Sequence, residues 1–275
     1  MRRSFRERLF RGVQQLPLLD HSGQSGAMDV ARRAEGGIRY VRLVNALALV
    51  ESVPGWLRPE DAEKLYELAH DTNGPILEVG TYRGKSVILI ATAAKDAGHD
   101  IVVYTLDVDR AAQRAAMAEA QARGVASMIV FIRGTLSAFA QAYPQVRPSL
   151  TFVDGDHTDA GVQRDLEALE TLVPSGGSLL FHDFNDPLNE DPACAEIGVR
   201  LTVERSWVAG QCEFVGEFGC CGLFTRRDAP PAGGIAVADL LRLDSARDQY
   251  LHRLRFPAGR AWKRLRGKRL HADAG

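Results

Sequence analysis

Residues 75–98 read "PILEVGTYRGKSVILIATAAKDAG", and this stretch decides the fold. Its first six residues are a short apolar run that ends in glycine, which is typical of a buried strand. After a short loop, residues 84–97 carry apolar side chains at helical spacing. This segment ends at Gly98, and a glycine is common where a helix stops. A buried strand followed at once by a helix predicts the first half of a βαβ unit.

The same alternation continues to residue 184. Further strands are predicted at 100–107, 127–134, 149–155 and 176–184, with helices at 111–124, 136–142 and 159–173. Residues 212–227, "CEFVGEFGCCGLFTRR", read as two strands with no helix between them. Short strands alternating with helices predict a parallel sheet covered on both faces. We therefore predict an α/β, Rossmann-like, doubly wound and mostly parallel seven-stranded sheet with an antiparallel C-terminal edge strand.

Three segments are expected along the chain. Residues 1–74 are predicted to be a partly helical N-terminal extension that covers the substrate side, and 75–227 to be the ligand-binding domain. Residues 228–275 are predicted to be a linker and a basic tail. Within the extension, 58–71 predicts a helix with Pro59 in its first turn, whereas 12–37 is weakly periodic and predicts loop or disorder.

Composition restricts the class of protein. The apolar fraction of 45% supports a sizeable core, no apolar run approaches the ~18 residues of a membrane span, and the N-terminus lacks the apolar region of a signal peptide. The four cysteines match no zinc-ligand spacing, and reduced thiols in a cytoplasmic protein are expected. The four are Cys194, Cys212, Cys220 and Cys221.

The net charge of −1 is unevenly distributed. Residues 1–11 carry +4 and residues 250–275 carry +7, which leaves −12 on the remainder. An acidic body with basic ends is not typical of a nucleic-acid-binding domain, so no nucleic acid partner is expected. The basic tail could contact an acidic membrane surface or a protein partner, or stay in solvent.

Polar or glycine residues end all five predicted parallel strands. In an open parallel sheet, ligands bind beyond the carboxyl ends of the strands, near the point where the strand order reverses. One site across that edge is therefore expected. The residues in question are Glu78 to Gly80, Asp107, Gly134, Asp154, and His182 with Asp183.

The first loop, after residue 79, resembles two known phosphate-binding patterns but matches neither. "GTYRGKS" is one residue short of a phosphate-binding P-loop, which leaves a nucleotide hydrolase as one alternative. The G-x-G-x-x-G pattern of dinucleotide-binding loops is missing as well. On physical grounds, Gly80 allows a ligand close to the backbone and Asp107 can accept both hydroxyls of a ribose.

With "ILEVGTYRGKSV", "FVDGDHTDAGVQRDLEAL" and "PSGGSLLFHDF", residues 57–226 resemble the class I S-adenosylmethionine-dependent methyltransferases. The subgroup resembled includes bacterial sugar and small-molecule O-methyltransferases. The resemblance implies that Asp107 binds the cofactor ribose and that Tyr82 replaces the family's usual second glycine. The cofactor-binding residues it implies are Glu78, Gly80, Tyr82, Gly84, Ser86, Asp107, Gly134, Thr135 and Asp154.

The resemblance also implies a metal site. In catechol-type and related sugar methyltransferases, acids that end the fourth and fifth strands hold Mg²⁺, and Asp154 and Asp183 match those positions. Mg²⁺ prefers oxygen ligands. His182 departs from the family pattern and could ligate a softer metal, act as a base or cap its strand. The predicted metal ligands are Asp154, Asp183 and His182.

Three residues are candidates for proton transfer: His157, His182 and Asp156. A metal would chelate two substrate oxygens and lower the pKa of the attacking one, and either histidine could then accept the proton at neutral pH. A hydrogen-bonded structural role is the alternative for each histidine. Asp159 is expected to cap the helix that follows or lie in its first turn.

The sequence thus predicts a cytoplasmic S-adenosylmethionine-dependent O-methyltransferase, assisted by a divalent metal such as Mg²⁺. A hydroxylated small molecule or glycan is the expected acceptor, and a homo-oligomer formed through the extension is a further expectation. Besides the nucleotide hydrolase, the alternative is a non-catalytic scaffold of the same fold whose basic tail docks on a membrane or partner.

Overall fold

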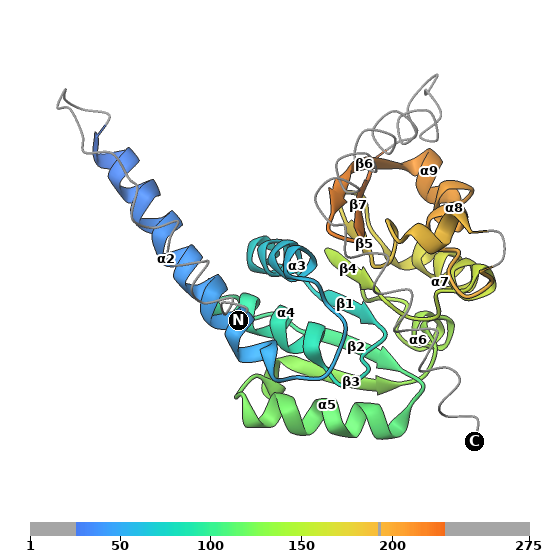
Figure 1. Cartoon of the computed structure of the whole chain (residues 1–275), viewed down its shortest axis with the longest axis horizontal. Helices are drawn as coiled ribbons and strands as arrows, with labels where there is room; N and C mark the ends of the chain where they lie inside the picture. Colours follow the sequence, from blue (N-terminus) through green and yellow to red (C-terminus); the bar gives the residue numbers. More distant parts are fainter. Residues whose placement is uncertain (1–25, 192–193, 229–275) are drawn as a thin grey trace, which may run out of the picture. The chain divides into compact units, whose positions relative to one another are not determined.

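Seven strands form one sheet in the order β3-β2-β1-β4-β5-β7-β6 in the computed structural model, which describes residues 26–191 and 194–228 (Figure 1). The first five strands pair in parallel, and β7 pairs antiparallel with both β5 and β6. This confirms the predicted mostly parallel seven-stranded sheet and its antiparallel C-terminal strand, β7, which lies between β5 and β6 rather than at the edge. The strands are β1 (Ile76–Val79), β2 (Val103–Asp107), β3 (Ile129–Arg133), β4 (Leu150–Val153), β5 (Ser178–Phe181), β6 (Cys212–Phe218) and β7 (Cys221–Arg226).

Helices cover both faces of the sheet because successive strand residues point to opposite sides. Ile76 on β1 packs into one apolar cluster with the helices that precede β3, and Leu77 packs into a second cluster with the later helices. The first group is α2 (Gly26–Glu51), α3 (Pro59–Asp71), α4 (Lys85–Ala97) and α5 (Arg110–Ala122). The second is α6 (Leu136–Ala142), α7 (Asp159–Leu172), α8 (Val199–Glu204) and α9 (Trp207–Gln211).

Side-chain caps begin three of these helices just after a strand. Asp109 accepts hydrogen bonds from the first turn of α5, Thr135 from that of α6 and Thr158 from that of α7. Such caps satisfy backbone N–H groups that have no partner within the helix. Asp159 therefore lies in the first turn of α7, as expected. Short 3₁₀ helices at Ala126–Met128 and Pro187–Glu190 complete the regular structure of the described residues.

Within the described residues, the chain divides into two units between Arg42 and Leu43. The expectation of loop over residues 12–37 is wrong from Gly26 onward, where α2 begins. The Ala- and Arg-containing run that follows Gly26 has high helix propensity, and this outweighs the unfavourable glycines at 36 and 37. Residues 12–25 and the basic tail lie outside the described residues.

Candidate active site

The order of the sheet reverses between β1 and β4, and the two loops that leave these strands lie side by side. β2 pairs with one edge of β1 and β4 with the other. A Cβ atom added to Gly80 would lie 1.9 Å from the Asp154 carbonyl oxygen, so only glycine fits between the two loops. The predicted site residues after β1 and β4 therefore flank the point where the strand order reverses, which is where ligands of such sheets bind.

Asp107, at the end of β2, organises the first loop. Its Oδ2 accepts the backbone N–H of Tyr82 at 2.7 Å, and its Oδ1 accepts that of Asp109 at 2.7 Å. Tyr82 has a φ of +43°, which is strained for a residue with a side chain. The carboxylate thus holds the strained turn and keeps further lone pairs for a ligand's hydroxyls.

The turn after β3, which the resemblance places near the cofactor, lies next to Asp107. The backbone N–H of Gly134 donates to the Asp107 carbonyl oxygen at 3.0 Å. The Thr135 hydroxyl accepts from the backbone N–H of Ala138, so this side chain serves as the cap of α6. Gly84 begins α4 with a φ of +91°, and a Cβ there would lie 2.9 Å from Ala116.

Glu78 on β1 is fully buried. Its Oε2 accepts a hydrogen bond from the hydroxyl of Thr105, whereas its Oε1 has no hydrogen-bond partner among the described residues. Burial raises the pKa of this carboxyl to about 8, although the hydroxyl groups of Ser86 and Thr105 oppose the shift. A buried carboxyl oxygen without a partner is unfavourable, and a cationic ligand group would both satisfy it and favour its ionised form.

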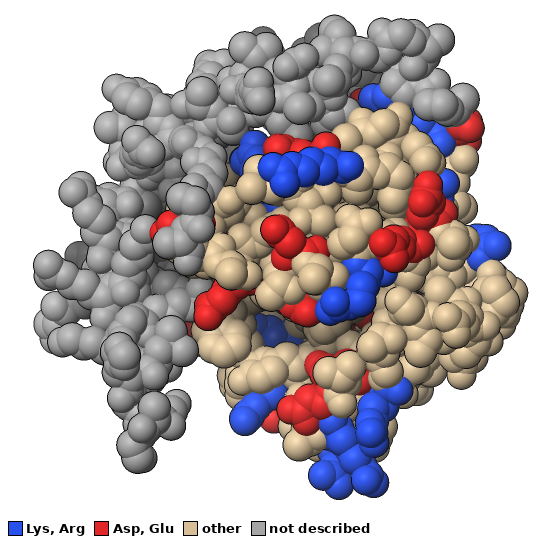
Figure 2. Space-filling model, turned by 90° about the vertical axis from the view of Figure 1, so that its right-hand side faces the viewer, with Lys and Arg blue, Asp and Glu red and all other residues tan. Residues whose placement is uncertain are grey.

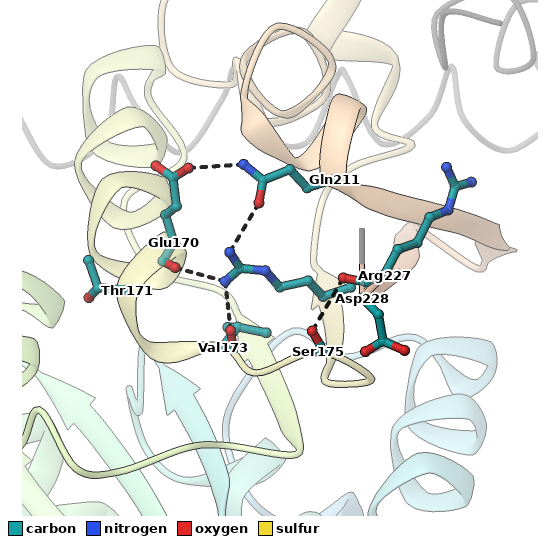
Figure 3. A pocket seen from close by; sticks show the side chains of 8 residues that line it. Glu170, Thr171, Val173, Ser175, Gln211, Arg227 and Asp228 are labelled. Atoms are coloured by element: carbon teal, nitrogen blue, oxygen red, sulfur yellow. Dashed lines mark hydrogen bonds between the residues drawn. The ribbon is translucent and has the colours of Figure 1, made fainter. Parts of the chain in front are cut away.

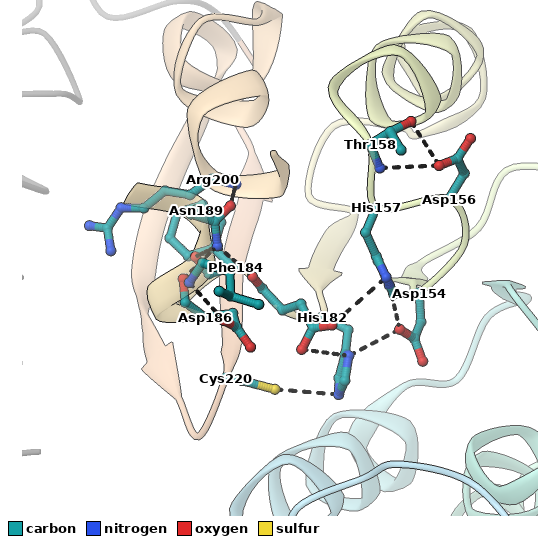
Figure 4. Close-up of polar contacts among 12 residues, drawn as sticks. Asp154, Asp156, His157, Thr158, His182, Phe184, Asp186, Asn189, Arg200 and Cys220 are labelled. Carbon is teal, nitrogen blue, oxygen red and sulfur yellow. Dashed lines mark hydrogen bonds and ion pairs between the residues drawn. The ribbon is translucent and has the colours of Figure 1, made fainter. Parts of the chain in front are cut away.

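Asp154, His157 and His182 meet at the ends of β4 and β5 (Figure 4). Oδ1 of Asp154 lies 3.0 Å from Nε2 of His157 and 3.0 Å from Nδ1 of His182. Asp183 closes the group, with one carboxylate oxygen 3.5 Å from His182 Nδ1 and the other 3.8 Å from His157 Nδ1. The structure thus brings His157, which the sequence predicted only as a candidate for proton transfer, beside the three predicted metal ligands.

The carboxylates and imidazoles of this cluster shift each other's pKa values. Burial raises the pKa of Asp154, but the rings of His182 and His157 outweigh burial and lower it overall. Burial lowers the pKa of the two histidines, yet the Asp154 carboxylate raises that of His157 and brings that of His182 well above its usual range. The carboxylates that favour a proton on these rings also favour a metal cation in its place.

Asp183 is the second described non-glycine residue with a positive φ, at +53°, and it too follows a strand end. The side-chain amide of Asn189 donates to its carbonyl oxygen at 2.8 Å and to that of Asp186 at 2.9 Å (Figure 4). Asn189 is itself buried and accepts the backbone N–H of Arg200 at 2.8 Å. The turn that aims Asp183 at the cluster is therefore strained and held by a buried amide, as is common at functional sites.

Asp156 lies apart from the cluster. Its carboxylate accepts hydrogen bonds from the backbone and hydroxyl of Thr158 and forms an ion pair with Arg164 at 3.0 Å. These contacts shape the start of α7. The geometry therefore assigns Asp156 a structural role and leaves the two histidines as the candidates for proton transfer.

Two residues of this region were not found from the sequence. Asp61 of α3 is fully buried, and its Oδ2 lies 3.2 Å from the Cys220 sulfur and 3.7 Å from His182 Nε2. The Cys220 sulfur lies 3.3 Å from the same Nε2. Asp61 also accepts the backbone N–H of Arg58, and a capping acid at that position is the only signal the sequence offered.

A separate cleft lies at the other end of the sheet (Figure 3). The guanidinium group of Arg226, near the start of β5, donates there to the carbonyl oxygens of Glu170 and Val173 and to Gln211 Oε1. No predicted site residue lines this cleft. Its lining residues are Glu170, Thr171, Val173, Ser175, Gln211, Arg226, Arg227 and Asp228.

The fold and the position of the site define a class of enzymes that bind a cofactor at the edge of a doubly wound sheet. Residues 77–184 match a family described as "Methyltransferase domain". Over these residues the chain is similar to that family, which agrees with the resemblance to the class I S-adenosylmethionine-dependent methyltransferases found in the sequence. The match favours a methyltransferase over the nucleotide-hydrolase alternative, and Lys85, which that alternative would place on a phosphate, donates to the Gly55 carbonyl oxygen at 3.4 Å.

Solved structures share the fold at low identity. Cofactor-bound Rv0187 from MTB is 19% identical with a TM-score of 0.55, over 68% of this chain and 90% of that one. The O-methyltransferase from Bacillus cereus in complex with SAH is 17% identical with a TM-score of 0.51, over 68% and 91%. SAH-bound methyltransferase PaMTH1 from Podospora anserina is 16% identical with a TM-score of 0.52, over 77% and 100%.

No helix in the described part of the chain is long and apolar enough to cross a membrane. The predicted cytoplasmic location and tail contact remain predictions.

Proposed function

We propose that this methyltransferase transfers a methyl group from S-adenosylmethionine to a hydroxyl oxygen of a small molecule or glycan, with a divalent metal at the ends of β4 and β5. The observation that carries the proposal is the convergence of two carboxylates and two imidazoles beside the predicted cofactor loop. Carboxylate and imidazole groups are metal ligands. When bound there, a divalent cation would lower the pKa of a coordinated hydroxyl.

The cofactor would occupy the crevice between the first loop and the turn after β3. Asp107 would accept the ribose hydroxyls, because its two oxygens already face the loop and retain lone pairs. Glu78, whose Oε1 is buried without a partner, would face the positively charged methionine end of the cofactor. The solved relatives from Bacillus cereus and Podospora anserina, both holding SAH, support this choice of ligand.

His157 is the better proton acceptor of the two histidines. Its side chain is partly exposed, whereas His182 is buried, and Asp154 orients its ring at 3.0 Å. A base must reach the acceptor's hydroxyl proton, and only the ring of His157 is open to a bound acceptor. In-line positioning of oxygen, methyl carbon and sulfur would supply much of the remaining catalysis.

The acceptor side is formed by an exposed aromatic pair. Trp56, with 69% of its surface exposed, stacks on Tyr82 of the first loop at a centroid distance of 5.5 Å. Such a surface suits a sugar ring or an aromatic acceptor. Acidic and basic side chains are interspersed on the face in Figure 2 rather than gathered into one basic area, which favours a small acceptor over a nucleic acid.

The test is a methyl-transfer assay with labelled S-adenosylmethionine against acceptors that carry two neighbouring hydroxyls, one hydroxyl or an amine. We expect turnover on the paired hydroxyls, and loss of turnover but retained cofactor binding in Asp154→Ala and Asp183→Ala. Methylation of amines alone would contradict O-methylation. Full activity of both variants in the presence of EDTA would contradict metal assistance, and no turnover on any acceptor would favour the scaffold alternative.

A further inference from the structure

His182 is buried between two groups of residues that contact opposite sides of its ring (Figure 4). Nε2 faces Cys220 and Asp61 in the interior, and Nδ1 faces Asp154 and Asp183 at the site. The tautomer of the ring, and with it the role of each nitrogen, depends on which side holds the proton.

The interior side places that proton on Nε2. The thiol of Cys220 donates to Asp61 Oδ2 at 3.2 Å. The Asp61 carboxylate also receives the backbone N–H groups of Arg58 and Cys220, which favour its ionised form, and an ionised carboxylate can only accept. The sulfur, 3.3 Å from Nε2, is then left to accept a hydrogen bond from the ring. When a metal ion takes the place of the second ring proton, a His182 that keeps its proton on Nε2 presents the lone pair of Nδ1 to that ion.

That lone pair points toward two carboxylates. Nδ1 is buried and makes no hydrogen bond of acceptable geometry with any described residue, although Asp154 Oδ1 lies 3.0 Å away and Asp183 Oδ1 lies 3.5 Å away. Three electron-rich atoms so close together repel one another unless a proton or a metal cation lies among them. Metal-ligating histidines are typically held by a hydrogen bond from the other ring N–H. Here that bond goes to Cys220, which in turn donates to the Asp61 carboxylate.

We infer that His182 Nδ1 ligates the metal of this site and makes it selective for a first-row transition-metal ion over Mg²⁺, with Asp61 and Cys220 as positioning residues. Mg²⁺ prefers oxygen donors and keeps its waters, whereas imidazole favours the later divalent ions of the first row. The inference rests on the proposed function only for the position of the metal. Metal binding itself is measured without an acceptor and without turnover.

The test is calorimetric titration of the full chain with Co²⁺ and with Mg²⁺, in the absence of substrate. We expect Co²⁺ to bind at least about 100-fold more tightly than Mg²⁺ in the wild type. His182→Asp replaces the nitrogen with oxygen donors and should bring that ratio down by about 10-fold or more. His99→Gln, which changes a histidine bonded to the His70 carbonyl oxygen away from the site, is the matched control.

Two substitutions of Cys220 distinguish a role in positioning His182 from a merely structural role. Cys220→Ala should lower Co²⁺ affinity by about 10- to 100-fold, and Cys220→Ser should restore most of it because a hydroxyl can relay the same two hydrogen bonds. Thermal unfolding of each variant checks the fold.

Three results would overturn the inference. They are equal or tighter binding of Mg²⁺ by the wild type, an unchanged ratio in His182→Asp, and a thiolate-to-cobalt charge-transfer band, which would place the ion on the cysteine side. If selectivity is found but S-adenosylhomocysteine does not bind, the proposed function fails while the metal site stands.

Discussion

Replacing Glu78 with glutamine should change how the stability of this protein depends on pH. Burial raises the pKa of Glu78 from 4.5 to about 8 in the folded chain. Below the ordinary value the carboxyl is protonated in both states; as the pH rises toward 8, only the unfolded state ionises. The free energy of unfolding must therefore fall over this window, by ~1.4 kcal/mol for each pH unit.

The measurement is urea unfolding of the cofactor-free protein at about pH 5 and about pH 7.5, where this slope makes the wild type lose about 3 kcal/mol more than Glu78→Gln. Any loss caused by the amide itself is the same at both pH values and cancels. Glu167→Gln changes an exposed glutamate of α7 and should leave the slope unchanged. Parallel pH dependence in the wild type and Glu78→Gln would refute the reasoning.

Three further substitutions test the loops around the cofactor. Asp107→Ala should weaken S-adenosylhomocysteine binding at least about 100-fold, since two hydrogen bonds of ~1.5–3 kcal/mol to a carboxylate are lost; Asp109→Asn, which keeps the helix cap, should bind normally. Gly80→Ala should lower the free energy of unfolding by more than Gly98→Ala in urea unfolding, because both have positive φ but only Gly80 meets a backbone carbonyl; equal losses would argue against a close approach of the loops. Trp56→Ala should raise the acceptor KM about 10-fold without changing cofactor affinity, given ~0.5–1.5 kcal/mol for a stacked ring; a parallel loss of cofactor affinity would instead place Trp56 over the cofactor.

The parts of the site that could be predicted are those that follow strand ends. Apolar runs located β1, β4 and β5, and the rule that parallel strands end at one edge was enough to bring Asp154, His182 and Asp183 together. His157 was predicted only as a candidate for proton transfer, and its contact with Asp154 depends on the tight turn before α7.

The interior support of His182 could not be predicted. Asp61 and Cys220 are separated by 159 positions and meet because α3 packs beside the β6–β7 hairpin, a tertiary contact that no local pattern encodes. The sequence showed Asp61 only as a polar residue in the first turn of a helix. Likewise, Cys220 was indistinguishable from an ordinary reduced thiol, since its pairing with His182 depends on the register of β7 against β5.

The most direct test of the central claim is calorimetric titration of the wild-type chain with S-adenosylhomocysteine, with ATP–Mg²⁺ as the control. The site described above predicts micromolar binding of S-adenosylhomocysteine, its loss in Asp107→Ala, and no binding of ATP. Binding of ATP without S-adenosylhomocysteine, or of neither ligand, would contradict a methyltransferase site at this edge of the sheet.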